Sequence, residues 1–267
     1  MGGGPLAAET IRRSDLAVRV TLVVPVLNVE PQLRQTLDQL RPVREVQDLE
    51  ILIVVDVPDA RRHREVVEEH QRIADEFGIS VLYRVGQRGF GSALRHGFAM
   101  ASGEAVIPLM ADASDDPRDI LRFVEKLAEG WDVVAGSRYM LGGRIVGNTM
   151  KQRLSRMYGR LVWFLGNLPV RDASNSFKAY RREVIDSLTT RAESYDISAE
   201  LTVKAHQAGF RVTEIPTVWT NRQLGKSHWR FLPEVRRYGR WLALAAVRGR
   251  VPSRRGRDRP KQDGRTP

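Results

Sequence analysis

The chain contains no cysteine among its 267 residues. Disulfide bonds, thiolate metal sites and cysteine nucleophiles are therefore excluded. It also lacks an apolar run near the roughly 18 residues that a membrane-spanning helix needs. The longest candidates, Val20–Val29 and Leu161–Val170, are too short and each begins directly after an arginine. The first residues lack the basic and apolar segments of a secretory signal, so we expect a soluble, cytosolic protein.

Acidic residues are in the minority, with 32 Asp and Glu against 43 Lys and Arg, for a net charge of +11. Residues 248–267 hold eight basic and two acidic side chains, so this tail carries +6 of that charge. A basic tail suits nucleic acid or an anionic membrane surface, and a disordered solubilising tail is an equal alternative. A hydrophobic content of 42% excludes a wholly disordered chain.

The first half of the chain alternates short Val- and Ile-rich runs with longer helical stretches. The predicted strands are residues 19–26, 49–56, 79–84, 104–110 and 131–137. The predicted helices between them are residues 30–40, 61–77, 91–101 and 117–129. This alternation predicts an α/β fold with a mostly parallel central sheet flanked by helices, in which ligands bind beyond the carboxyl ends of the strands.

The second half is less regular, and we interpret it as an elaboration of the same domain. It has a Gly-rich loop at 141–147, predicted helices near 151–165 and 197–208, and a predicted strand near 211–219. The expected organisation is a disordered tail at 1–18, one domain at 19–230, an amphipathic helix at 231–248 and a disordered basic tail at 249–267.

Three segments that follow predicted strands offer polar groups or close backbone approach. The segment Pro25–Glu30 forms a strand-to-helix turn in which Asn28 can cap the helix. Asp56 ends the second strand, where it would meet a nucleotide base or ribose, although an aspartate before a Pro-containing turn is equally a cap. The glycines between Arg88 and Gly97 precede a helix and would allow an anion to bind there, or only close helix packing.

An acidic cluster follows the fourth strand, at Asp112, Asp115 and Asp116. Three carboxylates this close repel one another unless they share a cation, and oxygen ligands suit Mg²⁺ or Mn²⁺ holding a diphosphate. A helix cap ahead of Pro117 accounts for Asp115 or Asp116 but not for Asp112. Arg138, after the fifth strand, would face the same cleft and bind a phosphate or form an ion pair.

Taken in order, these segments resemble the family 2 glycosyltransferases with a GT-A fold, and most of all their polyprenol-phosphate (dolichol-phosphate) mannosyltransferase branch. The resemblance covers about residues 19–250. It also includes the segments Gly136–Tyr139, Asp172–Arg181, Glu214–Pro216 and Arg222–Ser227, and Glu200 within a helix. The number of ordered segments makes the resemblance specific, since no single one of them is.

The resemblance implies a role for each matching residue. Asp56 would contact the base of a nucleotide sugar, with Pro25, Asn28, Glu30, Arg88 and Gly91 around the donor. Asp112, with Asp115 or Asp116, would bind the Mg²⁺ or Mn²⁺ that bridges the donor diphosphate. The acceptor phosphate would be bound by Arg138, Lys151, Arg153, Ser155, Arg222, Lys226 and Ser227. Asp172 and Glu200 would make polar contacts around the sugar or acceptor, and Asp112, Arg138 and Arg222 would carry catalysis.

Two departures from the family pattern bear on these roles. The usual Asp-x-Asp motif has Met110 in place of its first aspartate, so that metal binding rests on Asp112. The usual Asp-Asp-Gly-Ser after the second strand is shortened to the segment Asp56–Asp59.

The function implied is inverting transfer of a hexose from a UDP- or GDP-sugar to a polyprenyl phosphate. A phosphate acceptor is already anionic and needs no general base, whereas a hydroxyl acceptor would need a carboxylate. Phe231–Arg248 projects an apolar face of Phe231, Val235, Tyr238, Leu242, Ala245 and Ala246 opposite arginines, which predicts peripheral contact with the cytoplasmic membrane surface or packing on the core. Three alternatives stay open: a hydroxyl acceptor, a degenerate glycosyltransferase that only binds, and a non-catalytic nucleic-acid-binding protein.

Overall fold

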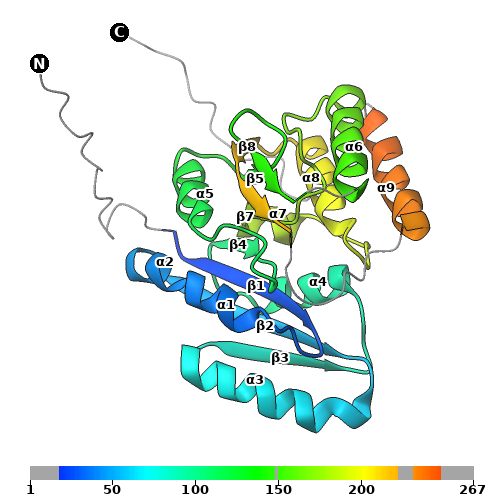
Figure 1. Cartoon of the computed structure of the whole chain (residues 1–267). Coiled ribbons are helices and arrows are strands. Elements are labelled where there is room, and N and C mark those ends of the chain that lie inside the picture. The colour runs from blue at the N-terminus through cyan, green and yellow to red at the C-terminus, as the bar shows by residue number, and fades with distance from the viewer. Residues whose placement is uncertain (1–17, 148–149, 222–230, 248–267) are drawn as a thin grey trace, which may run out of the picture.

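A computed structural model describes residues 18–147, 150–221 and 231–247 (Figure 1). Its centre is a seven-stranded sheet with the order β3-β2-β1-β4-β7-β5-β8. The strands are β1 (Val20–Leu27), β2 (Leu49–Val57), β3 (Ser80–Val85), β4 (Ala105–Pro108), β5 (Val133–Ser137), β7 (Lys178–Arg181) and β8 (Val212–Pro216). All pairings are parallel except those of β7, which runs antiparallel to both β4 and β5. The mostly parallel sheet is confirmed.

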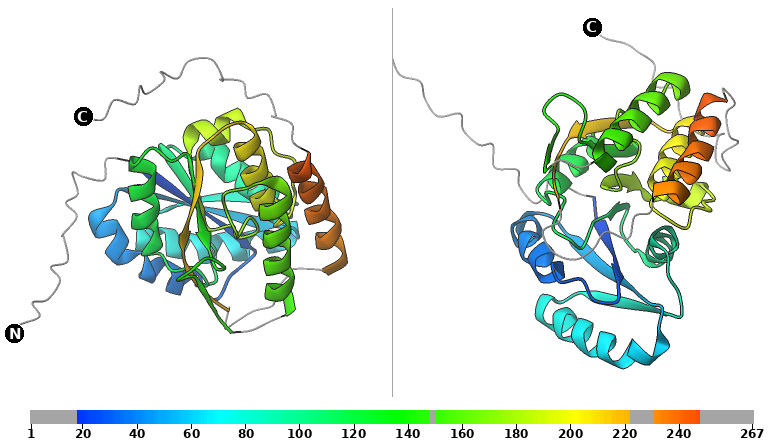
Figure 2. Two further views of the ribbon diagram at one scale, coloured as in Figure 1. Left: turned by 90° about the horizontal axis from the view of Figure 1, so that it is seen from above. Right: turned by 45° about the vertical axis from the view of Figure 1, so that its right-hand side comes forward.

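Helices cover both faces of this sheet, as the views in Figure 2 show. One face is packed against α1 (Leu33–Gln39), α2 (Arg41–Val46), α3 (His63–Phe77) and α5 (Asp119–Ala128). The other face is packed against α4 (Phe90–Met100), α6 (Met150–Gly166), α7 (Arg182–Ser187), α8 (Ile197–Gln207) and α9 (Phe231–Ala246). This three-layer arrangement explains why the strands are almost continuously apolar, since both of their faces are buried.

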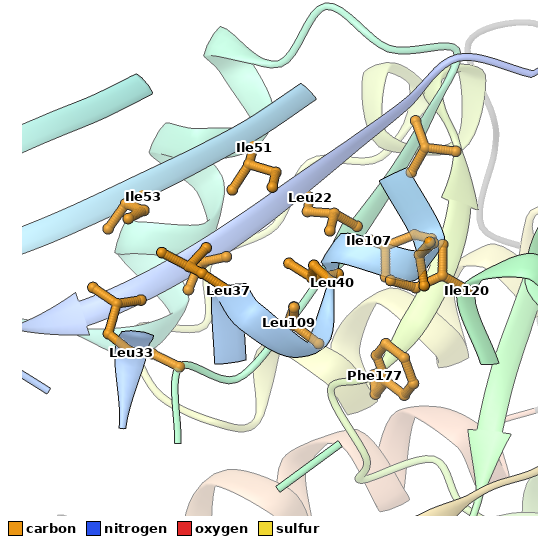
Figure 3. Packing of buried hydrophobic residues seen from close by; sticks show 14 of the residues in the cluster. Leu22, Leu33, Leu37, Leu40, Ile51, Ile53, Ile107, Leu109, Ile120 and Phe177 are labelled. Carbon is orange, nitrogen blue, oxygen red and sulfur yellow. The ribbon is translucent and has the colours of Figure 1, made fainter. Parts of the chain in front are cut away.

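The core on the first face is aliphatic. In Figure 3, Leu22, Ile53 and Ile107 of three neighbouring strands lie near Leu37 of α1 and Leu40, which joins α1 to α2, and all of these side chains are buried. Removing such a side chain costs roughly 2–5 kcal/mol, because the lost apolar contact leaves a cavity. The rigid sheet fixes the loops at its carboxyl edge.

Several predicted boundaries need correction. Pro25 does not end the first strand, because β1 continues to Leu27 with Pro25 paired in register to Val54. Asn28 does not cap a helix, since α1 begins only at Leu33. The strand β7, which inserts between β4 and β5, was not predicted. The strand predicted near 211–219 divides into β8 and the start of β9 (Val218–Thr220), and β9 pairs with the unpredicted β6 (Arg144–Val146) in a two-stranded sheet.

Of the two alternatives for the apolar face of α9, packing on the core holds in the centre of the helix. Tyr238 and Leu242 are partly buried and pack against the core, and Ala245 is buried there with Trp241. Tyr238 meets Tyr158 of α6 edge to face, with ring centroids 4.9 Å apart. Within the described ranges, no helix is long and apolar enough to cross a membrane.

Candidate functional site

The carboxyl edge of the sheet gathers the residues that sequence analysis placed after each strand. Asp56 ends β2 and lies in register with Leu27 at the end of β1. Asp112 follows β4, and Arg138 directly follows β5. Because these strands are parallel, their carboxyl ends lie at the same edge of the sheet.

Asp56 is buried and tied to the segment before α4. Its Oδ2 accepts a hydrogen bond from the Gly89 amide at 2.8 Å, and Oδ1 lies 3.3 Å from Nε of the buried Arg84. Burial raises the pKa of Asp56, while the Gly89 bond and Arg84 act in the opposite direction. Asp56 therefore positions the loop that carries Arg88 against the end of β2.

A surface hollow of about 420 Å³ lies beside Asp56. It is lined by Leu27, Asn28, Val29, Pro58, Asp59, Arg62 and Arg88. Asn28 has a left-handed backbone (φ 54°), its amide donates to the Asp56 carbonyl at 2.8 Å, and its buried Oδ1 has no hydrogen-bond partner. The hollow brings Asn28 and Arg88 together as predicted and adds Arg62, which follows β2 too distantly in sequence to stand out.

Asp112 and Asp115 form a buried carboxylate pair beyond β4. Each side chain is at most 6% exposed, and Asp115 Oδ2 accepts the Met110 amide at 3.3 Å. Burial, together with the neighbouring charge of Asp112, raises the pKa of Asp115 to about 7. Two carboxylates that resist joint ionisation are suited to sharing a cation.

Asp116 does not join this pair. Its carboxylate accepts hydrogen bonds from the backbone and guanidinium of Arg118, with Nη2 at 2.6 Å, and these bonds lower its pKa. The helix starts two residues later than predicted, at Asp119. Asp116 therefore organises the turn before α5, and in the described part of the chain no cluster of three or more metal-ligating side chains forms.

Arg138 forms a nearly buried ion pair with Asp172. Its Nε and Nη2 donate to the two carboxylate oxygens at 2.7 and 2.9 Å, and its backbone amide donates to the same carboxylate. Nη2 also reaches Ser155 of α6 at 3.2 Å and Ser174 at 3.3 Å. The ion pair lowers the pKa of Asp172 despite its complete burial, and raises that of Arg138.

The carboxylate pair and the Arg138 ion pair lie near each other. The charge of Arg138 partly offsets the rise in the pKa of Asp115, so the arginine lies within electrostatic reach of the carboxylate pair. Trp219 lies under the Arg138 guanidinium at 6.0 Å and forms a backbone bridge with Asp115. Two acidic side chains and an arginine therefore lie near one another at the edge of the sheet.

The profile of the family described as Glycosyl transferase family 2 matches residues 21–189, more than half of the chain. The chain belongs to this family. Over 218 residues, 79% of this chain, it is 25% identical to a dolichol-phosphate mannosyltransferase of Pyrococcus furiosus. Over 162 residues, 58% of this chain, it is 32% identical to a polyprenol monophosphomannose synthase of Mycolicibacterium smegmatis. The matched regions span 59% and 61% of those relatives, so the chain covers about three fifths of their length.

Solved structures agree on the fold. A glucosyl-3-phosphoglycerate synthase from Mycobacterium tuberculosis, crystallised with Mn²⁺, UDP and glucosyl-3-phosphoglycerate, superposes with a TM-score of 0.64. The match covers 91% of this chain and 86% of that one at 18% identity. The same enzyme has also been crystallised with Mg²⁺ and UDP. The GT-A arrangement predicted for this family 2 chain is therefore confirmed.

Glu200 is fully buried and its carboxylate is bonded within the protein. Its fully buried carboxylate accepts the backbone amides of Arg191 at 3.0 Å and Ala192 at 2.8 Å, and it pairs with Lys204 at 2.6 Å. These bonds hold the segment before α8 rather than a sugar. Sequence reasoning missed this because two of the partners of Glu200 are backbone amides, which leave no trace in residue type.

The helix N-terminus at Gly91 is likewise covered by protein. The Gly91 amide donates to the Glu193 carbonyl at 3.0 Å, and a side chain at Gly91 would collide with the backbone of Ala192. Gly97 similarly leaves room for Val23. In this family 2 chain these glycines permit close packing, and the predicted anion contact at Gly91 is replaced by a protein hydrogen bond.

The remaining predicted site residues lie in different parts of the chain. Ser155 joins the Arg138 site, whereas Arg153 is exposed on the outer side of α6 and Glu30 Oε1 lies 3.5 Å from the Gln32 amide. Lys151 belongs to α6, but its side chain is outside the described part. Arg222, Lys226 and Ser227 also lie outside the described residues, so their predicted roles stay predictions.

Lys178 is a further residue of the site that the sequence analysis did not predict. Lys178, at the start of β7, is fully buried below Asp172 and donates to the carbonyls of Ala173, at 3.1 Å, and Asn175. Burial lowers the pKa of Lys178 to about 7. Asn175 in turn donates to the Gly136 carbonyl at 2.8 Å, so this lysine secures the loop that presents Asp172 to Arg138.

Proposed function

We propose that the chain is an inverting glycosyltransferase that moves a hexose from a UDP- or GDP-sugar to a polyprenyl phosphate at the cytoplasmic face of a membrane. The observation that carries the proposal is the adjacency of the Asp112–Asp115 pair to the Arg138 site. One side can hold a cation for a diphosphate, and the other presents an arginine and serines for a phosphate. The names of the two curated relatives support a polyprenyl phosphate acceptor.

The donor would bind with its base in the hollow next to Asp56. Asn28 Oδ1 and the Arg62 and Arg88 side chains offer an acceptor and cations there. The diphosphate would then extend toward Asp112. The repulsion between Asp112 and Asp115 fits a divalent cation, which would neutralise the departing diphosphate when bound. The solved structures with Mn²⁺ or Mg²⁺ and UDP support this assignment.

The chemistry would be a single displacement. A phosphate oxygen of the acceptor forms a bond to the anomeric carbon, and the bond from that carbon to the donor diphosphate breaks with its electron pair. Because the attacking oxygen is already anionic at neutral pH, no proton has to be removed. Arg138, held rigid by Asp172 and aided by Ser155 and Ser174, would position the phosphate for attack.

Glycosyl transfer to a hydroxyl group is the second candidate, and it would require a carboxylate base. Two carboxylates could serve as that base. Asp172 already accepts two hydrogen bonds from the Arg138 side chain, and Glu200 accepts hydrogen bonds from backbone amides and from Lys204. Their engagement favours the phosphate acceptor. We assign this activity to residues 19–230 and retain the basic tail at 249–267 as a second contact with an anionic membrane.

The test is nucleotide release by the full chain from a panel of UDP- and GDP-hexoses, with Mg²⁺ or Mn²⁺, with and without polyprenyl phosphate. We expect release from one donor only when both the lipid phosphate and the cation are present. Release that depends instead on a sugar or alcohol acceptor would assign the second function. The productive donor would identify both the base and the sugar.

A further inference from the structure

A short loop at residues 86–89 connects β3 to α4 and carries Arg88 to the hollow beside Asp56. This largely exposed loop is attached to the sheet by two hydrogen bonds of 2.8 Å. The Gly86 amide donates to the carbonyl at the end of β2, and the Gly89 amide donates to Asp56 Oδ2. Both bonds hold the loop on its β2 side, so its order also depends on what holds it where α4 begins.

The start of α4 is held by the segment that precedes α8. The Gly91 amide donates to the Glu193 carbonyl at 3.0 Å. Arg95, one turn further along α4, donates to the Ala192 carbonyl and pairs with the Glu193 carboxylate. A Cβ at Gly91 would lie 2.3 Å from the Ala192 carbonyl oxygen, so the glycine is needed for this close approach. The segment before α8 and the start of α4 therefore form one junction.

Tyr195 makes the aromatic contact of this junction. Its ring stacks on Phe90, the first residue of α4, with ring centroids 4.6 Å apart and an interplanar angle of 24°. Phe90 lies two residues after Arg88 and packs against the core on the α4 face of the sheet. Stacked aromatic pairs stabilise a contact beyond the apolar area that they bury. The Tyr195 ring is therefore placed to hold the end of the loop that carries Arg88.

The residues on either side of Tyr195 are bonded to α9. Ser194 Oγ donates to the buried Glu234 carboxylate at 2.7 Å. Trp241 Nε1 donates to the buried Asp196 carboxylate, also at 2.7 Å. The helices α4 and α9 cover the same face of the sheet (Figure 1). The turn at Tyr195 therefore joins α9 to the start of α4.

We propose that Tyr195 is a positioning residue for the nucleotide of the donor, which acts by holding the Phe90 end of the loop that carries Arg88. The helix α9 in turn holds Tyr195 through the hydrogen bonds of its two neighbours. A loop that is fixed before the nucleotide arrives loses less conformational entropy on binding. The contacts of α9 therefore raise nucleotide affinity at a hollow that α9 does not line.

This inference rests on the proposed function for the identity of the ligand, so the order of the loop is measured separately, in the full chain without ligand. The observable is hydrogen exchange of the backbone amides at residues 86–92. Tyr195→Ala should accelerate this exchange at least about tenfold and leave residues 20–27 of β1 unchanged. Tyr195→Phe keeps the stacked ring and should retain the wild-type rate.

Nucleotide binding is measured by titration calorimetry with UDP and GDP in the presence of Mn²⁺. Tyr195→Ala should raise the dissociation constant of the preferred nucleotide at least about fivefold, and Tyr195→Phe less than about twofold. With the productive donor, KM for the donor should rise by the same factor, while kcat and KM for polyprenyl phosphate stay unchanged. The matched control Trp131→Ala, which removes a partly buried ring in contact with Arg211 before β5, should change none of these values.

Two further variants test the route. In a chain that already carries Arg88→Ala, Tyr195→Ala should weaken nucleotide binding less than about twofold, because the side chain that it positions is gone. Trp241→Phe keeps a ring but removes the hydrogen bond to Asp196, and should raise the dissociation constant about two- to threefold.

Four results would overturn the inference. They are unchanged exchange at residues 86–92 in Tyr195→Ala, an equal loss of nucleotide affinity in Trp131→Ala, additive effects of Tyr195→Ala and Arg88→Ala, and an unchanged dissociation constant in Trp241→Phe. A wild type that binds neither UDP nor GDP would contradict the proposed function. The exchange measurement would then still decide whether Tyr195 holds the loop.

Discussion

The Asp112–Asp115 pair and the Arg138–Asp172 pair differ in how their buried charges are compensated. In the pair that we propose for the donor cation, burial and the neighbouring charge of Asp112 raise the pKa of Asp115. On the acceptor side, Arg138 and Asp172 compensate each other through two hydrogen bonds with good geometry. A bound cation would compensate the charge of the first pair, whereas each member of the second pair already has its counterion.

The first pair is therefore suited to binding a cation, and the second to holding the Arg138 side chain in one orientation. The repulsion within a buried carboxylate pair lowers the free energy of unfolding, and a bound cation removes that repulsion and stabilises the fold. A pre-formed ion pair holds its arginine in one orientation and keeps the entropy cost low when an anion arrives. Substitutions on the two sides should therefore differ in what they damage.

The largest effect is expected from Arg138→Ala. It leaves Asp172 buried without its counterion, and we expect a loss of about 3–5 kcal/mol in the free energy of unfolding, together with loss of transfer. Urea unfolding measures the first and nucleotide release the second. The double variant Arg138→Met, Asp172→Leu should recover most of the stability and none of the activity. A destabilisation below about 1 kcal/mol for Arg138→Ala would mean that the pair is not pre-formed.

Asp112→Asn should have the converse effect. Transfer should fall about 10³-fold, because a bound cation contributes several kcal/mol to the transition state, while the unfolding free energy without metal stays the same or rises as the repulsion on Asp115 disappears. The wild type should gain thermal stability on addition of Mn²⁺, and the variant should not. A variant that keeps transfer and its response to Mn²⁺ would remove Asp112 from the cation site.

Glu200→Gln tests a carboxylate to which we assign a structural role. The amide cannot satisfy both backbone amides and Lys204 as the carboxylate does, so we expect about 1–3 kcal/mol of destabilisation. Because Glu200 serves the fold, kcat/KM of the folded variant should stay within about threefold of the wild type. A large fall in kcat with unchanged stability would restore a catalytic role for this carboxylate.

The acceptor side should also show its own pH dependence through Lys178. The pKa of Lys178 is lowered to about 7, so between about pH 7 and pH 10 the folded chain binds fewer protons than the unfolded chain. Stability therefore rises with pH across this window. Relative to Lys178→Met, the wild type should gain about 1–2 kcal/mol in unfolding free energy between pH 7 and pH 9, measured in urea. Parallel pH profiles for the two proteins would show that Lys178 is charged throughout.

The smallest effect is expected from Asp116→Asn, the control for the donor side. It weakens the turn around Arg118, which should cost about 0.5–1 kcal/mol, and should leave both transfer and the Mn²⁺ response intact. A loss of cation-dependent transfer equal to that of Asp112→Asn would extend the cation site to Asp116.

Much of the donor side could be predicted from sequence because it depends on local order. Long apolar runs identify the buried strands, and residues that follow parallel strands, such as Asp56 and Asp112, must meet at one edge. The pair of Arg138 with Asp172 could not be derived in this way, since it joins residues 34 positions apart. The strand β7 was missed because its four residues, Lys178–Arg181, show neither an apolar run nor a regular alternation.

Which apolar side of α6 and α9 is buried could not be predicted from the sequence either. Both α6 and α9 have apolar and basic residues in helical spacing, and periodicity alone does not reveal which apolar side meets the core. Tertiary packing decides it: Trp241 and Ala245 of α9 are buried, whereas Phe164 of α6 is exposed. A burial pattern of this kind depends on contacts between helices that are far apart in the sequence.

The central claim is that the cleft pairs a cation-bound diphosphate with an anionic acceptor. The most direct measurement compares polyprenyl phosphate with the corresponding polyprenol as acceptors for the productive donor, by nucleotide release with Mn²⁺ and with a chelator. The account predicts release only with polyprenyl phosphate and Mn²⁺ together, and loss of that release in both Asp112→Asn and Arg138→Ala. Equal release with polyprenol, or release that survives the chelator, would contradict it.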